Sequence, residues 1–186
     1  MRVSTIFEET GALLTGHFLL TSGLHSNKYL QCARVLQWPR YAEFCARSMV
    51  ERLAGIKPEV VVSPAIGGII IGQEVARILG CRAVFAEREK GVLCLRRGFE
   101  IVPGEKTTVV EDVVTTGGST RETIQVAVLH GGVVIGASSI IDRSGGSVDL
   151  GVPYYSLWTL TIPTYTPEEC PLCRAGSRPI KPGSRA

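Results

Sequence analysis

Two adjacent acidic residues precede a loop rich in hydroxyl groups and glycine. The acids are Glu111 and Asp112, and the loop is Thr115-Thr116-Gly117-Gly118-Ser119-Thr120. Paired acids near the end of a strand seldom occupy a packed core, so a polar ligand should meet them. Because carboxylates repel phosphate, we expect them to accept hydrogen bonds from sugar hydroxyls or to approach a divalent cation that the substrate brings.

The loop itself predicts an anion-binding site. It follows a β-branched apolar run, Thr107 to Val114, and it leads into a helical pattern, which indicates a strand, a loop and a helix start. Gly117 and Gly118 free the backbone to curve around a ligand. Ser119 and Glu122 have the spacing of a capping box. Amides at the helix start and the helix dipole could hold a phosphate monoester without a lysine. The alternative is a solvated turn with two exposed acids.

Residues Thr108 to Thr120, TVVEDVVTTGGST, are typical of one enzyme family. They have neither the Gly-Lys-Ser/Thr ending of a Walker loop nor the G-x-G-x-x-G spacing of a dinucleotide-binding loop. They closely resemble the signature of type I phosphoribosyltransferases, which bind phosphoribosyl pyrophosphate (PRPP). The resemblance implies that Glu111 and Asp112 hold the ribose 2- and 3-hydroxyls and favour a cationic ribose, with Asp112 as a catalytic residue. It also implies that Thr115 to Thr120 wrap the 5-phosphate.

A second resemblance lies near the start of the chain. Residues Phe18 to Tyr29, FLLTSGLHSNKY, resemble the orotate-binding hood of orotate phosphoribosyltransferases. Orotate is a flat anionic ring that needs an apolar face and directed donors, which Ser22, Lys28 and Tyr29 could supply. Many members of this family have a lysine where this chain has Thr21, so that role is lost or moves to Lys28. An ordinary solvated strand lysine is the alternative for Lys28.

Two further segments are expected at the same sheet edge, because ligands of open α/β sheets collect at the carboxyl ends of strands. The strand Glu59 to Ser63 leads into Ala65-Ile66-Gly67-Gly68, which resembles the family's pyrophosphate loop, without the lysine that some orotate enzymes have there. A glycine pair that only allows close packing is the alternative. Arg143 follows the strand Val133 to Ile141 and matches the family's orotate-contacting arginine, whose planar fork suits a carboxylate. A plain surface arginine is its alternative, and Thr116 is also assigned to orotate.

The segment Glu87 to Gly98 is the most charged part of the chain. Such runs are usually solvated loops. The resemblance instead implies a mobile catalytic loop that crosses to the neighbouring subunit, where Arg88 and Lys90 would neutralise the departing pyrophosphate. The segment is short and has no histidine, so no protonating residue is assigned in it, and Arg96 and Arg97 could share the electrostatic role.

Length and composition fit one globular domain. The chain has 186 residues, of which 45% are hydrophobic and 20% charged, and its net charge is +3. This mild charge does not predict a nucleic-acid surface, and no apolar run is long enough for a membrane span. With no signal-peptide pattern at the start, we expect a cytoplasmic protein. We expect a hood at 1–37, a core at 38–165 and a C-terminal tail at 166–186.

Alternating strand and helix patterns predict an α/β fold, with a mostly parallel sheet flanked by helices and a small N-terminal hood. Helices are expected at Val3 to Leu14 and at Arg40 to Ala54, where Gly55 would be the stop. An extended run is expected at Lys28 to Leu36.

The cysteines divide into two groups. Cys32, Cys45, Cys81 and Cys94 lie among apolar residues and are expected to be reduced core thiols. Cys170 and Cys173 form one C-x-x-C pair, which is only half of a zinc site. Since His17, His25 and His130 show no spacing that completes it, we favour a docked or partly disordered tail. A zinc shared between subunits or with another cysteine is the alternative.

These patterns together predict an orotate phosphoribosyltransferase with Mg²⁺ as its cofactor. The resemblance implies a homodimer with shared active sites that uses orotate and PRPP. The Mg²⁺ would be held mainly by PRPP, close to Glu111 and Asp112. A purine-base phosphoribosyltransferase and a non-catalytic sensor of PRPP are the alternatives.

Overall fold

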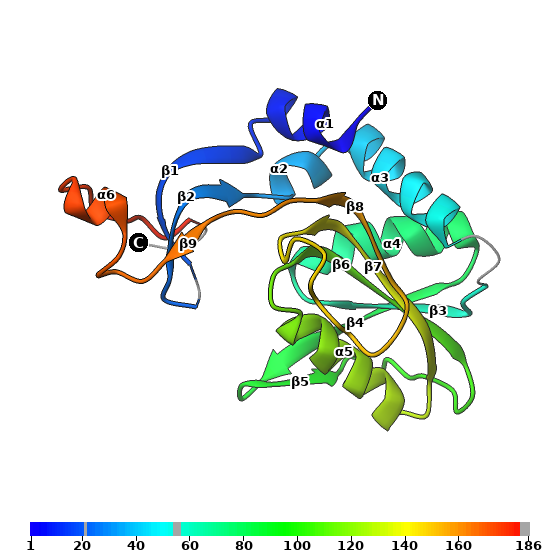
Figure 1. Ribbon diagram of the computed structural model, residues 1–186. Coiled ribbons are helices and arrows are strands. Elements are labelled where there is room, and N and C mark those ends of the chain that lie inside the picture. Colours follow the sequence, from blue (N-terminus) through cyan, green and yellow to red (C-terminus); the bar gives the residue numbers. More distant parts are fainter. Residues whose placement is uncertain (21, 54–56, 183–186) are drawn as a thin grey trace. The chain divides into compact units, whose positions relative to one another are not determined.

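The computed structural model describes residues 1–20, 22–53 and 57–182 (Figure 1). The chain forms two compact units. The terminal unit consists of Met1–Val35 and Thr161–Ala186, and the sheet unit consists of Leu36–Leu160. Both ends of the chain therefore contribute to one unit, although the hood and the tail were expected as separate segments.

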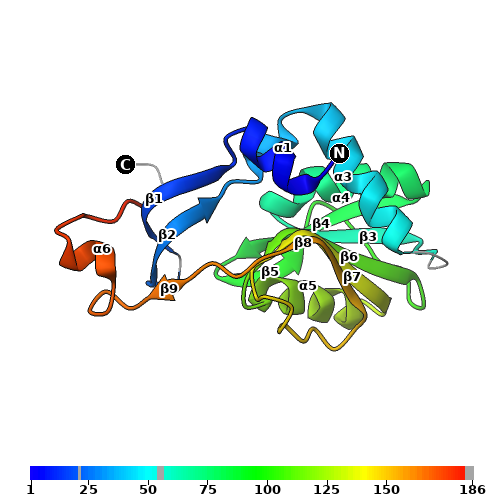
Figure 2. The same cartoon turned by 45° about the horizontal axis from the view of Figure 1, so that its top comes forward.

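The sheet unit is built on a six-stranded sheet with the order β5-β4-β3-β6-β7-β8. All neighbouring strands are parallel except β4 and β5, which form an antiparallel hairpin at one edge. Helices cover both faces: α3 and α4 lie on one side and α5 on the other (Figures 1 and 2). The α/β fold with a mostly parallel sheet is confirmed. The strands are β3 (Val60–Pro64), β4 (Arg82–Glu89), β5 (Val92–Leu95), β6 (Lys106–Val114), β7 (Val133–Asp142) and β8 (Tyr154–Thr159), and the helices are α3 (Pro39–Arg52), α4 (Gly67–Leu79) and α5 (Gly118–Leu129).

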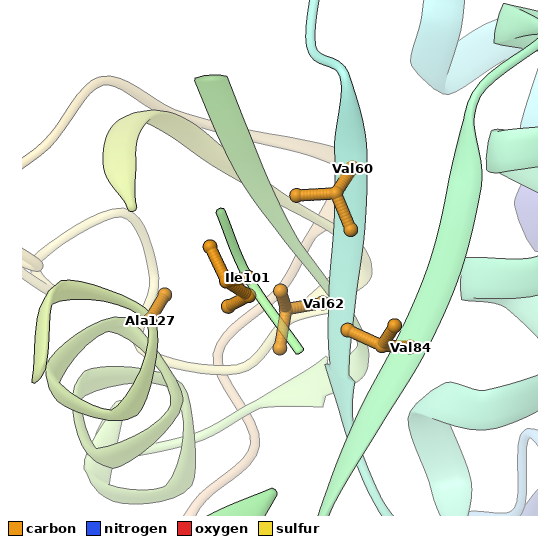
Figure 3. Packing of buried hydrophobic residues seen from close by; sticks show 5 residues of the cluster. All are labelled: Val60, Val62, Val84, Ile101 and Ala127. Carbon is orange, nitrogen blue, oxygen red and sulfur yellow. The ribbon is translucent and has the colours of Figure 1, made fainter. Parts of the chain in front are cut away.

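The central strand β3 shows why its sequence is a continuous apolar run. Val60 and Val62 pack with Val84, Ile101 and Ala127 of α5 in one core cluster (Figure 3). Val61 points to the other face, since a Cβ on Gly72 of α4 would lie 3.6 Å from it. A parallel strand that is covered on both faces needs apolar residues at successive positions.

The terminal unit contains a small antiparallel sheet with the order β1-β2-β9. The C-terminal segment borders both edges of the β1–β2 hairpin. On one edge β9 pairs with β2, and on the other Ile180 forms a parallel bridge with Phe18 of β1. The elements are α1 (Val3–Glu9), β1 (Leu13–Leu19), β2 (His25–Leu30), β9 (Thr164–Tyr165) and α6 (Pro171–Arg174), and α2 (Ala33–Leu36) leads into the sheet unit. The described part of the predicted tail is thus docked on the hairpin.

Three predicted elements have different bounds. The first helix ends at Glu9 rather than Leu14, because Gly11 adopts a left-handed φ of 60° and the chain then enters β1. The extended run predicted for Lys28 to Leu36 ends at Leu30, and α2 follows. Helix α3 ends at Arg52, and the predicted stop at Ala54 and Gly55 lies outside the described residues.

None of the helices in the described part of the chain has the length and apolar character that crossing a bilayer requires.

Candidate active site

Strand β6 places both acids at its carboxyl end, as predicted. Glu111 is buried, and this burial raises the pKa of its carboxyl well above the usual value, with the negative charge of Asp112 raising it further. The Asp112 amide donates to Glu111 Oε1 at 3.1 Å, and the Val113 amide donates to Asp112 Oδ1 at 2.8 Å. Hydroxyl donors or a cation at this place would favour the charged form of Glu111.

The loop after β3 lies directly against these acids. A Cβ atom on Gly67 would lie 2.7 Å from both carboxylate oxygens of Asp112, so a side chain there would displace the carboxylate. Gly67 is the first residue of α4, after Ala65 and Ile66. The first amides of a helix have no partner within it. The structure therefore brings Asp112 together with the amide-rich start of α4, as the sheet topology predicted.

The loop after β6 forms the start of α5. Gly117 is the N-cap residue with a φ of 77°, and a Cβ there would lie 2.7 Å from Val148 and 2.8 Å from Leu150. Thr115, Thr116, Gly118 and Ser119 are exposed, whereas Thr120 is buried beneath them. Exposed hydroxyls and helix-start amides at one place are suited to hold a phosphate.

The predicted capping box is wrong. Helix α5 begins at Gly118, so Ser119 lies within its first turn, and no side chain of the described residues caps the start. Glu122 instead forms an ion pair with Arg88 at 2.8 Å. Glu122 thus pairs with a residue of strand β4 instead of capping its own helix. The first amides of α5 are left without a side-chain cap.

Arg121 is a site residue that the sequence reasoning missed. Its guanidinium donates to the carbonyl oxygen of Thr116 at 2.8 Å and to that of Asp149 at 3.1 Å. It therefore fixes the loop Thr115–Thr120 against the segment after β7. A basic residue in the first turns of a helix opposes the helix dipole, and this mismatch is the signal that could have identified it.

The charged segment Glu87 to Gly98 is a β-hairpin rather than a loop. Arg88 lies in β4 opposite Leu93, which is buried, so an apolar residue anchors the charged run to the sheet. The ion pair with Glu122 raises the pKa of Arg88. Lys90 lies exposed at the hairpin turn with a φ of 51°.

The two arginines that follow β5 form ion pairs with glutamates of β4. Arg96 contacts Glu89 at 3.4 Å, and Arg97 contacts Glu87 at 2.9 Å.

Arg143 follows β7, as expected. Its amide donates to the Val114 carbonyl at 2.8 Å, which ties it to the end of β6. The buried Asp142 carboxylate accepts hydrogen bonds from the amides of Ser144 and Gly146 at 2.7 and 3.0 Å. The half-buried Arg143 is therefore held at the same sheet edge as the two acids.

The predicted hood residues belong to the terminal unit. Ser22 lies in the turn before β2, and Lys28 and Tyr29 lie in β2. Tyr29 packs on Phe18 with ring centroids 5.8 Å apart, whereas Lys28 is exposed. Thr21, where many relatives have a lysine, lies outside the described residues.

The cysteine predictions have a mixed outcome. All six cysteines are free, including the four that were expected to be reduced. Cys32 and Cys45 are buried, but Cys81 and Cys94 are only partly buried. The conclusion that no histidine completes the Cys170–Cys173 pair is wrong, because His17 and His25 both lie beside it.

Comparison with known proteins identifies the family. No protein-family model matches the chain. It is 55% identical to the orotate phosphoribosyltransferase of Pelotomaculum thermopropionicum over 98% of this chain and 96% of that protein. It is 54% identical to the orotate phosphoribosyltransferase of Caldanaerobacter subterraneus over 99% and 97%. The chain belongs to the orotate phosphoribosyltransferase family.

Solved structures agree in fold. The orotate phosphoribosyltransferase of Aeropyrum pernix has a TM-score of 0.71 at 26% identity, and covers 85% of this chain and 93% of its own. An adenine phosphoribosyltransferase from Thermoanaerobacter pseudethanolicus, 18% identical, covers 72% and 88% with a TM-score of 0.61. The fold is thus shared with a phosphoribosyltransferase named for a different base. It is the sequence identity that assigns this chain to the orotate phosphoribosyltransferases.

We predict that Gly67→Ala lowers kcat/KM for PRPP roughly tenfold to a hundredfold, because the added methyl group displaces the Asp112 carboxylate from its position. Steady-state kinetics would measure this. Ile70→Ala is the matched control, since it removes an exposed side chain from the same turn of α4. Equal kinetics for Gly67→Ala and the wild type would show that the position of Asp112 is unimportant.

Proposed function

We propose that this enzyme transfers the phosphoribosyl group of PRPP to orotate, giving orotidine 5'-monophosphate and pyrophosphate in the synthesis of UMP. The observation that supports this most directly is the 55% identity over 98% of the chain to a protein named for this activity. The site is consistent with it, because paired carboxylates lie between two helix starts that are suited to bind anions.

The reaction is a displacement at the anomeric carbon of the ribose. A ring nitrogen of orotate forms the new bond to this carbon and loses its proton to the departing pyrophosphate or to solvent, while the bond from the carbon to pyrophosphate breaks and its electron pair leaves with pyrophosphate. Positive charge develops on the sugar, and negative charge leaves it. The protein therefore needs no nucleophile of its own, and positioning and electrostatics provide the catalysis.

Glu111 and Asp112 are proposed to bind the ribose 2- and 3-hydroxyls. The exposed hydroxyls of Thr115, Thr116 and Ser119 and the amides of the Thr115–Thr120 loop would bind the 5-phosphate. The pyrophosphate would meet the amides of Ile66 to Gly68, since the Ala65 amide donates to the Ala86 carbonyl at 2.7 Å. This assignment gives the anionic groups to the helix starts and leaves the carboxylates for the sugar.

The acids also fit a divalent cation. Glu111 and Asp112 are adjacent, and the charge of Asp112 raises the pKa of Glu111, so a nearby cation would relieve their repulsion. When bound with PRPP, Mg²⁺ would neutralise charge on the leaving pyrophosphate. We propose that these carboxylates lie close to it, with PRPP as its main ligand.

Arg88 and Lys90 are proposed to stabilise the departing pyrophosphate in a neighbouring subunit of a homodimer. Arg88 is 47% exposed in its ion pair with Glu122, and an exposed pair of this kind contributes little free energy. The guanidinium can therefore exchange Glu122 for a phosphate group at small cost. Lys90, at the tip of the hairpin, is exposed in the same way.

For orotate we propose Ser22, Lys28, Tyr29, Thr116 and Arg143 as binding residues. Arg143 is the most specific of them, because its two-pronged guanidinium matches the carboxylate that distinguishes orotate from other bases. A cytoplasmic location is also proposed, since all six cysteines are free, as in a reducing compartment.

We predict that the wild type consumes orotate in the presence of PRPP and Mg²⁺, and that Asp112→Asn lowers kcat roughly a hundredfold by removing charge that stabilises the cationic ribose. Glu74→Gln, which neutralises an acid of α4 that pairs with Arg77, should leave kcat unchanged. The decrease in orotate absorbance measures both. Unchanged turnover in Asp112→Asn would refute the ribose assignment.

Mixing of two inactive variants tests the shared site. If Arg88 acts in the neighbouring subunit, an equal mixture of Arg88→Ala and Asp112→Asn chains, after exchange of subunits, contains heterodimers with one intact site. Activity should then return to about one quarter of the wild-type value. Each variant alone is the control. A mixture that stays as inactive as its components would place Arg88 in its own subunit's site.

A further inference from the structure

Four potential metal ligands from both ends of the chain meet in the terminal unit. His17 and His25 come from β1 and β2, and Cys170 and Cys173 come from the start of α6. Their ligand atoms all lie within 4.8 Å of one another. His17, His25 and Cys170 are buried, and Cys173 is partly buried. None of these residues has a role in the proposed reaction.

The distances match a tetrahedral ion. His17 Nε2 lies 3.0 Å from His25 Nδ1 and 3.4 Å from Cys170 Sγ. Cys173 Sγ lies 3.3 Å from His25 Nδ1 and 3.8 Å from His17 Nε2. Ligands of one tetrahedral zinc, with Zn–N near 2.0 Å and Zn–S near 2.3 Å, are about 3.3 to 3.8 Å apart. These four distances are close to that range, and the two remaining pairs lie within 4.8 Å, so one ion fits among the four atoms after a small adjustment of the side chains.

The local fold explains why the two histidines meet. Leu19 is the cross-strand partner of His25, and His17, two residues earlier, lies on the same face of the hairpin. A register shift between Thr15 and Phe18 marks a bulge at this point, and bulges commonly redirect a side chain.

The cysteines are brought to the histidines by the pairing of the C-terminal segment with the hairpin. Before α6, β9 pairs with β2 at His25 and Ser26. After α6, the Ile180 amide donates to the His17 carbonyl at 2.9 Å. The short helix between these two anchors presents Cys170 and Cys173 one turn apart, which is the usual C-x-x-C arrangement.

His17 also has the outer contact that metal-binding histidines need. Its second ring nitrogen, Nδ1, lies 3.1 Å from the Ser177 hydroxyl. Such a contact orients the ring, so that Nε2 can present its lone pair to a metal. A network of hydrogen bonds alone explains the cluster less well, because His17 Nε2 is close to three polar atoms and can form only one strong hydrogen bond as donor or acceptor.

We propose that His17, His25, Cys170 and Cys173 bind one Zn²⁺ ion in a closed, structural site. Two imidazoles and two thiolates in a tetrahedral arrangement are a zinc ligand set. With four protein ligands no position remains for a substrate or a reactive water, so the ion stabilises the fold and does not take part in the reaction. It would fix residues 170–173 to a hairpin about 150 residues earlier in the chain.

The site has a consequence for the hood. Lys28 and Tyr29 lie on β2, the strand that contributes His25. Removal of the zinc should loosen β2 and its pairing with β9. The metal-binding proposal itself does not depend on the proposed reaction, and its test does not use activity.

The first experiment measures the metal content of the full-length wild-type protein, purified without chelator. We expect about one zinc per chain, and replacement by Co²⁺ should give the visible absorption of a tetrahedral cobalt–thiolate centre. Removal of the metal with a strong chelator should lower Tm, and added Zn²⁺ should restore it. Protein without zinc, which gives no cobalt spectrum when supplied with Co²⁺ under reducing conditions, would overturn the proposal.

Variants then identify the ligands. Cys173→Ser and His25→Ala should each weaken zinc affinity at least about tenfold. The matched controls are Cys81→Ser, which changes another partly buried free cysteine, and His130→Ala, which changes the histidine outside the cluster. Both controls should keep one zinc per chain. Zinc binding that is unchanged in Cys173→Ser and His25→Ala would place the metal elsewhere and refute the assignment.

A thiol assay provides a test that does not require a stable variant. In the native wild type, Cys170 and Cys173 should resist thiol reagents until the zinc is removed, and mass spectrometry of the labelled peptides can follow both residues. Reaction of both cysteines at the same rate with and without chelator would contradict the proposal. A Cys170–Cys173 disulfide in freshly purified native protein would contradict it equally.

Discussion

The contact between Gly67 and the Asp112 carboxylate is the constraint on which the rest of the site depends. At 2.7 Å from a hypothetical Cβ, the acid occupies the space that a side chain on α4 would need. This closeness follows from the parallel pairing of β3 with β6, whose carboxyl ends lie at the same edge of the sheet. The start of α4 and the acids of β6 can therefore contact the same small ligand.

At this edge of the sheet, an acidic pair lies close to two helix starts that are suited to bind anions. Glu111 and Asp112 form an acidic centre, where burial disfavours a second charge, as the raised pKa of Glu111 reflects. The helix starts of α4 and α5 flank it with amides, and Arg121 holds the α5 loop in place. A ligand with a neutral, hydroxyl-rich middle and anionic ends complements this pattern, and PRPP is such a molecule.

The parts of the site that the sequence predicted correctly are those determined locally. The β-branched run of β6 and the glycines before α5 define a strand, a loop and a helix within about twenty residues, and parallel pairing explains why Arg143 lies at the same edge. The errors have non-local causes. Glu122 pairs with Arg88 instead of closing a capping box, and the charges of the β4–β5 hairpin concealed the alternation that buries Leu93.

The His and Cys cluster illustrates the same limit. Two histidines on either side of a hairpin turn were visible in the sequence, but their relation to Cys170 and Cys173 depends on β9 and Ile180, which pair with the two edges of that hairpin. Contacts over 150 residues leave no periodic signal in the sequence. The family resemblance also gave no indication of them, since it spans about Gly16 to Arg143 and does not include the two cysteines.

The central claim is that the enzyme uses orotate as its base, and the most direct test compares its activity with different bases. Pyrophosphate release would be measured with PRPP and Mg²⁺, and with orotate, uracil, adenine, guanine or xanthine offered separately. Our account predicts rapid release with orotate and none above background with uracil, which differs from orotate only in lacking the carboxylate. Release with a purine instead of orotate, or tight binding of PRPP without release with any base, would contradict it.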